Sequence, residues 1–165
     1  MYDLALKNGW IVTGEGIRRT NLYVKDGKIA AITDADNEAA SVQDLAGLYV
    51  LPGCIDTHCH FRDPGATQKE DFAHGTRAAA AGGVTTVFDM PNTNPAVLEG
   101  ADVVQKTEYF RDKAYVDYGI WGLSLGHINL DKLAGMKAAG AAAVKFFWGY
   151  AINEKTHALI YNYTP

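Results

Sequence analysis

Two histidines one residue apart, His58 and His60, are the first side chains in this sequence that could act together chemically. They end an apolar run that starts at Cys54 and is typical of a β-strand. Side chains alternate between the faces of a strand, so these two imidazoles should point the same way. Paired neutral imidazoles pack poorly among apolar groups, but they supply half of a zinc site. The spacing therefore favours a metal site at the carboxyl end of this strand.

The second candidate is Lys145, which stands within the run Ala-Ala-Ala-Val-Lys-Phe-Phe-Trp. Burial disfavours an ammonium ion, so we expect the pKa of Lys145 to fall below its usual value of about 10.4. A neutral amine can react with carbon dioxide to give a carbamate, whose two oxygens can bridge two cations. The alternative is a lysine that extends past the strand end to solvent. The sequence alone leaves both possibilities open.

The elements that would position these residues follow a repeated strand, loop and helix pattern from residue 51 onward. Strands are predicted over residues 54–57, 85–90, 116–123 and 142–148, and helices over residues 68–81, 99–113 and 130–139. Thr67 and Glu70 have capping-box spacing at the first helix, and Asn129 is placed to cap the third. This alternation indicates βα units and a parallel sheet. We expect residues 51–165 to form the first four units of a TIM (β/α)8 barrel, which further polypeptide would complete.

Residues 1–50 have a different rhythm, in which short apolar runs alternate with turn sequences. Asn8-Gly9 and Asp26-Gly27 predict hairpins, because these residues accept positive φ angles. Residues 34–41 are polar and predict a surface loop. The fold class is therefore α/β, with a small β-sandwich module in residues 1–50 ahead of the partial barrel.

The composition excludes several classes of function. The chain has 165 residues, of which 48% are hydrophobic and 21% are charged, and its net charge is -4, as expected for a globular protein. The mild acidic excess argues against nucleic acid or an anionic membrane as a partner. We expect neither a membrane span nor a signal peptide. Cys54 and Cys59 lie on one predicted strand and do not make a disulfide framework, so we expect a cytoplasmic protein.

These motifs resemble the cyclic amidohydrolases, the group of dihydroorotases, hydantoinases (dihydropyrimidinases) and allantoinases. The resemblance is densest in Leu-Pro-Gly-Cys-Ile-Asp-Thr-His-Cys-His-Phe-Arg-Asp-Pro-Gly, which ends at Gly65, and in Asp-Met-Pro-Asn-Thr, which ends at Thr93. It implies that His58 and His60 bind Zn²⁺, and that a carboxylated Lys145 bridges this ion to a second. It also implies one or two zinc ions per subunit, a small cyclic amide as substrate, and a homo-oligomer, either dimer or tetramer.

The substrate signals are mixed. Arg62 and Asn92 match the dihydroorotase residues that hold the substrate carboxylate, and a guanidinium suits a carboxylate physically. The alternatives are a salt bridge from Arg62 to Asp63 or Glu70, and a turn role for Asn92. Tyr150 instead matches the hydantoinase tyrosine that stabilises the oxyanion, although it could simply cover apolar surface.

We therefore predict metal-dependent hydrolysis of a cyclic amide C–N bond, with dihydroorotase as the main assignment and hydantoinase, dihydropyrimidinase or allantoinase as alternatives. The resemblance implies that the general acid/base aspartate and two further histidines lie beyond Pro165, so we expect the 165-residue chain alone to be inactive. A non-catalytic scaffold homologue and a deaminase are the competing classes. The set His58, His60 and Lys145 disfavours the first. His74, His127 and His157 are expected to be structural or solvated.

Overall fold

The computed structural model describes residues 1–147, 149–152 and 159–163, and its side-chain contacts extend to Phe147. The chain divides into two compact units, Met1–Pro52 and Gly53–Pro165. No helix in the described ranges is both long enough and apolar enough to cross a membrane.

The first unit is one five-stranded sheet of β1 (Tyr2–Thr13), β2 (Gly16–Lys25), β3 (Lys28–Thr33), β4 (Ala39–Asp44) and β5 (Tyr49–Val50). The strand order is β3–β2–β1–β4, and β5 also pairs with β1. The β1–β2 and β2–β3 pairs are antiparallel, whereas β4 and β5 run parallel to β1. A second layer, which the predicted β-sandwich would need, is not found among the described residues of this unit.

Two local predictions in this unit are wrong. Asn8-Gly9 makes no hairpin, because β1 continues through it with a register shift between Leu6 and Gly9. Asn8 has a φ of 60°, so its tolerance of positive φ serves a bulge rather than a turn. Residues 39–41, predicted as loop, belong to β4 and pair with the start of β1. The Asp26-Gly27 turn is confirmed, with φ angles of 51° and 71°.

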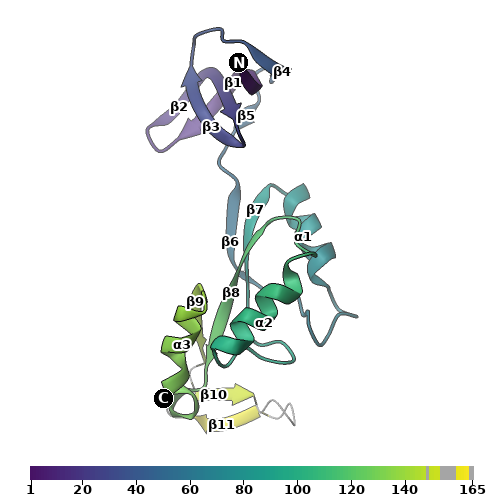
Figure 1. Cartoon of the computed structure of the whole chain (residues 1–165), viewed down its shortest axis with the longest axis vertical. Coiled ribbons are helices and arrows are strands. Elements are labelled where there is room, and N and C mark those ends of the chain that lie inside the picture. Colours follow the sequence, from purple (N-terminus) through teal and green to yellow (C-terminus); the bar gives the residue numbers. More distant parts are fainter. Residues whose placement is uncertain (148, 153–158, 164–165) are drawn as a thin grey trace. The chain divides into compact units, whose positions relative to one another are not determined.

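The second unit is a sheet of four parallel strands whose spatial order is also their chain order (Figure 1). These strands are β6 (Cys54–Cys59), β7 (Val84–Asp89), β8 (Asp117–Ser124) and β9 (Ala143–Phe146). The helices between them are α1 (Phe72–Ala81), α2 (Gly100–Phe110) and α3 (Leu133–Ala138), with the short 3-10 turns η1 (Gly126–Ile128) and η2 (Leu130–Lys132) ahead of α3. This is the arrangement of a partial parallel barrel. β10 (Gly149–Ile152) and β11 (Leu159–Tyr163) form a separate antiparallel pair.

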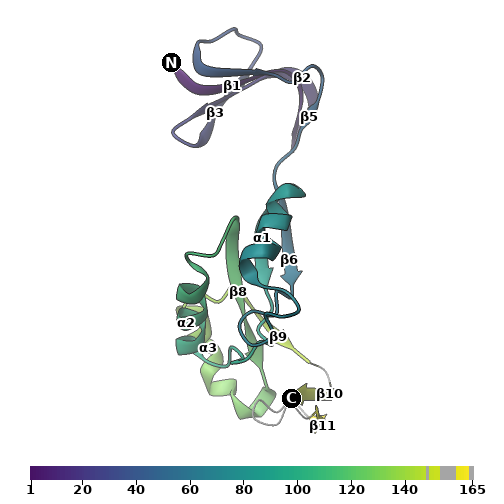
Figure 2. The same ribbon diagram turned by 90° about the vertical axis from the view of Figure 1, so that its right-hand side faces the viewer.

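One apolar cluster joins the helices to the sheet. Phe72 of α1, Val103 and Phe110 of α2, and Met136 of α3 pack with Val87 of β7 and Ile120 of β8. Because all three helices contribute to the same cluster, they cover the same face of the sheet (Figure 2).

Both predicted helix caps are wrong. α1 starts at Phe72 rather than residue 68, and Asp71 caps it by accepting from the His74 N–H at 2.8 Å. Asn129 caps no helix, because its side chain is committed elsewhere. It accepts from the Leu125 N–H at 2.7 Å and donates to the Leu123 carbonyl at 2.9 Å. At α1 another local cap replaces the predicted one, whereas at Asn129 bonds to other segments, including the Leu98 carbonyl at 3.0 Å, override the local signal.

Candidate functional site

The two histidines lie together at the carboxyl end of β6. Their ring centroids are 5.3 Å apart, with an angle of 49° between the ring planes. His58 is exposed and His60 is half-buried. Burial, and after it the charge of Lys145, lowers the pKa of His60 to about 4. His60 is therefore neutral near pH 7, the state in which an imidazole can bind a metal ion.

Lys145 is half-buried and lies on β9, where it pairs with Leu123 of β8. Its Nζ is 3.5 Å from Met90 Sδ and 4.7 Å from the ring centroid of Phe147. Burial lowers the pKa of Lys145, and the charge of Arg62 adds to this effect. The Lys145 amine thus contacts soft, apolar groups, and its charge helps to lower the pKa of His60.

The three candidate ligands fit part of a metal site. In the part of the chain that is described, no group of three or more His, Cys, Asp or Glu side chains converges on one point. The set consists instead of two imidazoles and one lysine amine, and a carbamate on that amine would add oxygen donors. A neutral histidine and a lysine of lowered pKa have the protonation states that such a set needs.

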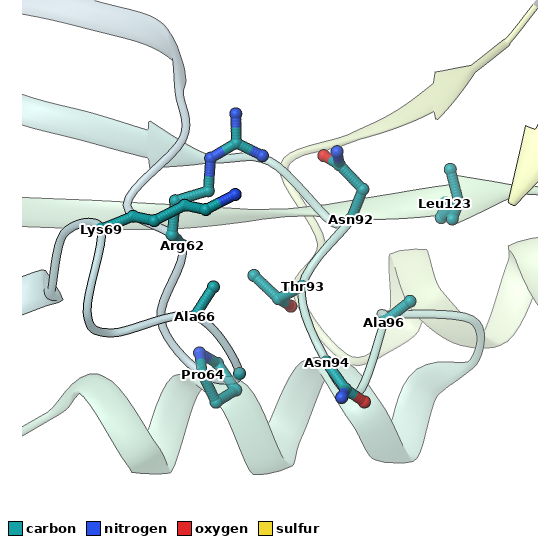
Figure 3. Close-up of a pocket in the computed structure, with 10 residues that line it drawn as sticks. Arg62, Pro64, Ala66, Lys69, Asn92, Thr93, Asn94, Ala96 and Leu123 are labelled. Atoms are coloured by element: carbon teal, nitrogen blue, oxygen red, sulfur yellow. The ribbon is translucent and has the colours of Figure 1, made fainter. Parts of the chain in front are cut away.

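A pocket of about 230 Å³ opens between the loop after β6 and the loop after β7 (Figure 3). Arg62 and Lys69 line one wall, and Asn92 and Thr93 line the other. Oδ1 of Asn92 is buried and has no hydrogen-bond partner among the described residues. A buried acceptor without a donor is costly, so this oxygen is suited to accept a hydrogen bond from a ligand.

Neither alternative role predicted for Arg62 is found, because within the described residues it forms no salt bridge with Asp63 or Glu70. Asp63 is 1% exposed and accepts from the Tyr109 hydroxyl at 2.7 Å and the Phe72 N–H at 3.1 Å. Lys113 lies 3.5 Å from the same carboxylate. Asp63 is thus occupied by other partners, and the Arg62 guanidinium lines the pocket.

Sequence reasoning missed a buried ion pair beneath the pocket, between Asp89 at the end of β7 and Lys106 of α2. The Lys106 Nζ lies 2.6 Å from Asp89 Oδ2, and the two residues are 5% and 0% exposed. Burial raises the pKa of Asp89 and lowers the pKa of Lys106, and their mutual attraction opposes both shifts. The Asp-Met-Pro-Asn-Thr motif marked Asp89, but the sequence of α2 gave no sign that Lys106 turns inward.

The structure does not place the remaining candidates in this arrangement. Tyr150 lies on β10, but its side chain is outside the described residues, as are Trp148 and His157. His74 is 66% exposed by its side chain and pairs with Asp71 at 2.5 Å. His127 lies in η1, just after the end of β8.

Gly65 provides a test of the pocket loop. Its φ is 105°, and an added Cβ would lie 2.5 Å from Asn94 Cβ and 2.8 Å from the Asn94 carbonyl oxygen. We expect Gly65→Ala to lower the free energy of unfolding by about 2–4 kcal/mol, through backbone strain and overpacking. Gly83→Ala is the matched control, because its φ is 84° but nothing lies within 4 Å of the added Cβ. Urea unfolding measures both, and equal losses would show that the contact with Asn94 is unimportant.

Comparison with known proteins identifies similar sequences and structures. The sequence profile of the amidohydrolase family matches residues 49–126. An allantoinase of Desulfitobacterium hafniense (strain Y51) is 41% identical over 148 residues, which cover 88% of this chain and 33% of the relative. An allantoinase of Deinococcus radiodurans is 40% identical over 151 residues, covering 90% and 34%. The chain thus spans about a third of the length of these relatives.

Solved structures of hydantoinases are also similar. The L-hydantoinase (dihydropyrimidinase) of Arthrobacter aurescens aligns with a TM-score of 0.80 at 32% identity, covering 87% of this chain and 32% of that one. A D-hydantoinase aligns with a TM-score of 0.77 at 35% identity, covering 90% and 33%. These names support the hydantoinase and allantoinase alternatives rather than the main assignment to dihydroorotase.

Proposed function

We propose that the whole protein opens a ring by hydrolysing a cyclic amide C–N bond. The premise is that the chain belongs to the cyclic amidohydrolase group of the amidohydrolase superfamily. One observation carries the proposal. The His58–His60 pair and the lysine that perturbs His60 share an edge of the parallel sheet with the Arg62–Asn92 pocket. In barrels of this kind the carboxyl ends of the strands form the active site.

We further propose that His58, His60 and Lys145 hold the metal, with zinc as the first ion to test and Lys145 as its carbamate. The bound ion would supply Lewis-acid activation of the ring carbonyl and of the attacking water. Carbamate formation joins the lysine nitrogen to the carbon of carbon dioxide and releases one proton. The lowered pKa of Lys145 supports this step, because only the neutral amine has the free electron pair.

The pocket supports a ring that carries an N–H group. Asn92 Oδ1 would accept a hydrogen bond from the ring nitrogen, since no described protein group donates to it. The Arg62 guanidinium would bind a carbonyl or carboxylate oxygen of the substrate. Tyr150 is the proposed donor to the oxyanion, by its match to the hydantoinases.

The relatives favour a hydantoin-type ring, such as hydantoin or allantoin, as the substrate. Dihydroorotate is the second candidate, because Arg62 lines the pocket without an ion-pair partner among the described residues. Assay of the whole protein on allantoin, hydantoin, dihydrouracil and dihydroorotate separates these possibilities. Failure to open any of the four rings would refute the proposed function.

Replacement of Arg62 by alanine tests which group that residue binds. Dihydroorotate and dihydrouracil differ only by a carboxylate, so loss of a charge-assisted hydrogen bond should lower kcat/KM roughly 10- to 100-fold for the first and much less for the second. Arg77→Ala is the control. Arg77 lies on α1, and its guanidinium carbon is 5.8 Å from the centroid of the Tyr115 ring. Equal losses on both substrates would exclude a carboxylate-binding role.

A further inference from the structure

Three protein oxygens lie close to the ammonium group of Lys106. Its Nζ pairs with Asp89 Oδ2 at 2.6 Å and donates to the Met90 carbonyl at 3.0 Å and to Thr93 Oγ1 at 3.1 Å. Two of the three N–H donors of the ammonium group are thus used in hydrogen bonds, and the Asp89 carboxylate balances its charge. Because the residue is only 5% exposed, its charge is directed to the protein and not to a ligand.

The groups held in this way lie on both walls of the pocket. Met90 and Thr93 stand on either side of Asn92 in the loop after β7, and Thr93 Oγ1 also donates to the Pro95 carbonyl at 2.8 Å. Asp89 connects Lys106 to the other wall, because its Oδ1 accepts a hydrogen bond from the Phe61 N–H at 3.1 Å. Phe61 is the residue between His60 and Arg62.

We propose that Lys106 is a positioning residue, which through Asp89 and Thr93 fixes Arg62 and Asn92 opposite each other and so sets the affinity for the ring substrate. The proposal rests on the proposed function, because it takes Arg62 and Asn92 as the substrate contacts. A buried ion pair is a poor source of stability compared with apolar packing, but it fixes geometry through directed contacts. Lys106 lies on α2, which packs against the sheet. Both pocket loops are therefore anchored to the same helix.

The other buried carboxylate, Asp63, is connected differently. Its partners are the Phe72 N–H, the Tyr109 hydroxyl and Lys113. These groups belong to α1, to α2 and to the residues just after α2, so Asp63 ties the first loop to the helices alone. Among the described ion pairs, only Asp89–Lys106 has contacts to both pocket loops, which are also joined by a hydrogen bond from the Asn94 N–H to the Pro64 carbonyl at 3.1 Å.

A double-mutant cycle in the whole protein tests the proposal. Lys106→Met, Asn92→Ala and the double variant are compared on whichever of allantoin, hydantoin, dihydrouracil and dihydroorotate the wild-type protein opens fastest. We expect Lys106→Met to raise KM about tenfold with kcat changed less than about threefold, because positioning acts on binding. In the Asn92→Ala background the same substitution should raise KM clearly less than it does in the wild-type protein, because one of the two residues that it positions is gone.

Two further variants separate positioning from stability. Thr93→Val removes the hydroxyl between Lys106 and Pro95 but leaves the ion pair, so it should fold and should raise KM several-fold, again only when Asn92 is present. Val103→Ala shortens a buried side chain of the same helix and removes no polar contact to either loop. It should lower the melting temperature with KM unchanged.

The possible failures are distinct. Additive effects of Lys106→Met and Asn92→Ala in an active protein would overturn the positioning role alone, as would an equal KM increase from Val103→Ala. A wild-type protein that opens none of the four rings would overturn the proposed function, and the positioning role with it.

Discussion

Replacement of His60 by alanine is expected to remove most of the metal from the whole protein and to lower kcat/KM roughly 10³-fold, since a catalytic metal contributes several kcal/mol of transition-state stabilisation. His60 is half-buried, lies with its ring centroid 5.3 Å from that of His58, and has its pKa lowered to about 4. It is thus the more preorganised imidazole of the pair. Elemental analysis of the purified protein measures the bound metal independently of turnover.

The matched control is His74→Ala. This histidine is exposed and pairs only with the neighbouring Asp71, so its removal should leave both metal content and turnover near wild-type values. Lys145→Ala should resemble His60→Ala in both measurements if the lysine is a ligand. Full metal occupancy in the His60 variant would show that the ion lies elsewhere.

The largest expected loss of stability comes from Phe72→Ala. Phe72 is 0% exposed, stacks on Phe110 at 3.6 Å between ring centroids, and meets the edge-on rings of Phe61 at 5.0 Å and Tyr118 at 5.4 Å. Its truncation should lower the free energy of unfolding by about 3–5 kcal/mol, because it leaves a cavity at the junction of α1, α2 and β8. Urea denaturation of the whole protein measures this change.

Tyr115→Ala is the control for ring size. Tyr115 is 59% exposed, so its loss should cost less than about 1 kcal/mol. A Phe72 variant as stable as the Tyr115 variant would mean that the aromatic cluster is not the core of this unit.

Much of the second unit could be predicted from the sequence because the signals are local and periodic. Apolar runs mark β6 to β9, and the alternation of a strand alone places His58 and His60 on one face. The lowered pKa of Lys145 follows from its apolar neighbours. These inferences do not require knowing which distant segments of the chain contact each other.

The features that could not be predicted depend on contacts between segments that are distant in the sequence. Asn8 serves a bulge because β1 pairs on both sides, and Asn129 leaves its expected cap for three hydrogen bonds to Leu98, Leu123 and Leu125. Lys106 looks like a solvated helix lysine until α2 packs against β7. The preference for dihydroorotate rested on Arg62 and Asn92, whereas the relatives named above are allantoinases and hydantoinases.

The strand register also governs the order in which the chain can fold. Trp10 pairs with Tyr49, and Cys54 pairs with Val84, so each contact closes a long loop before it contributes stability. Helices α1 and α2 need only local contacts and can form on the microsecond scale or faster, but the parallel ladders must wait for distant segments to meet. Sheet assembly is therefore the slow step, and the histidine pair and its lysine come together only when that step is complete.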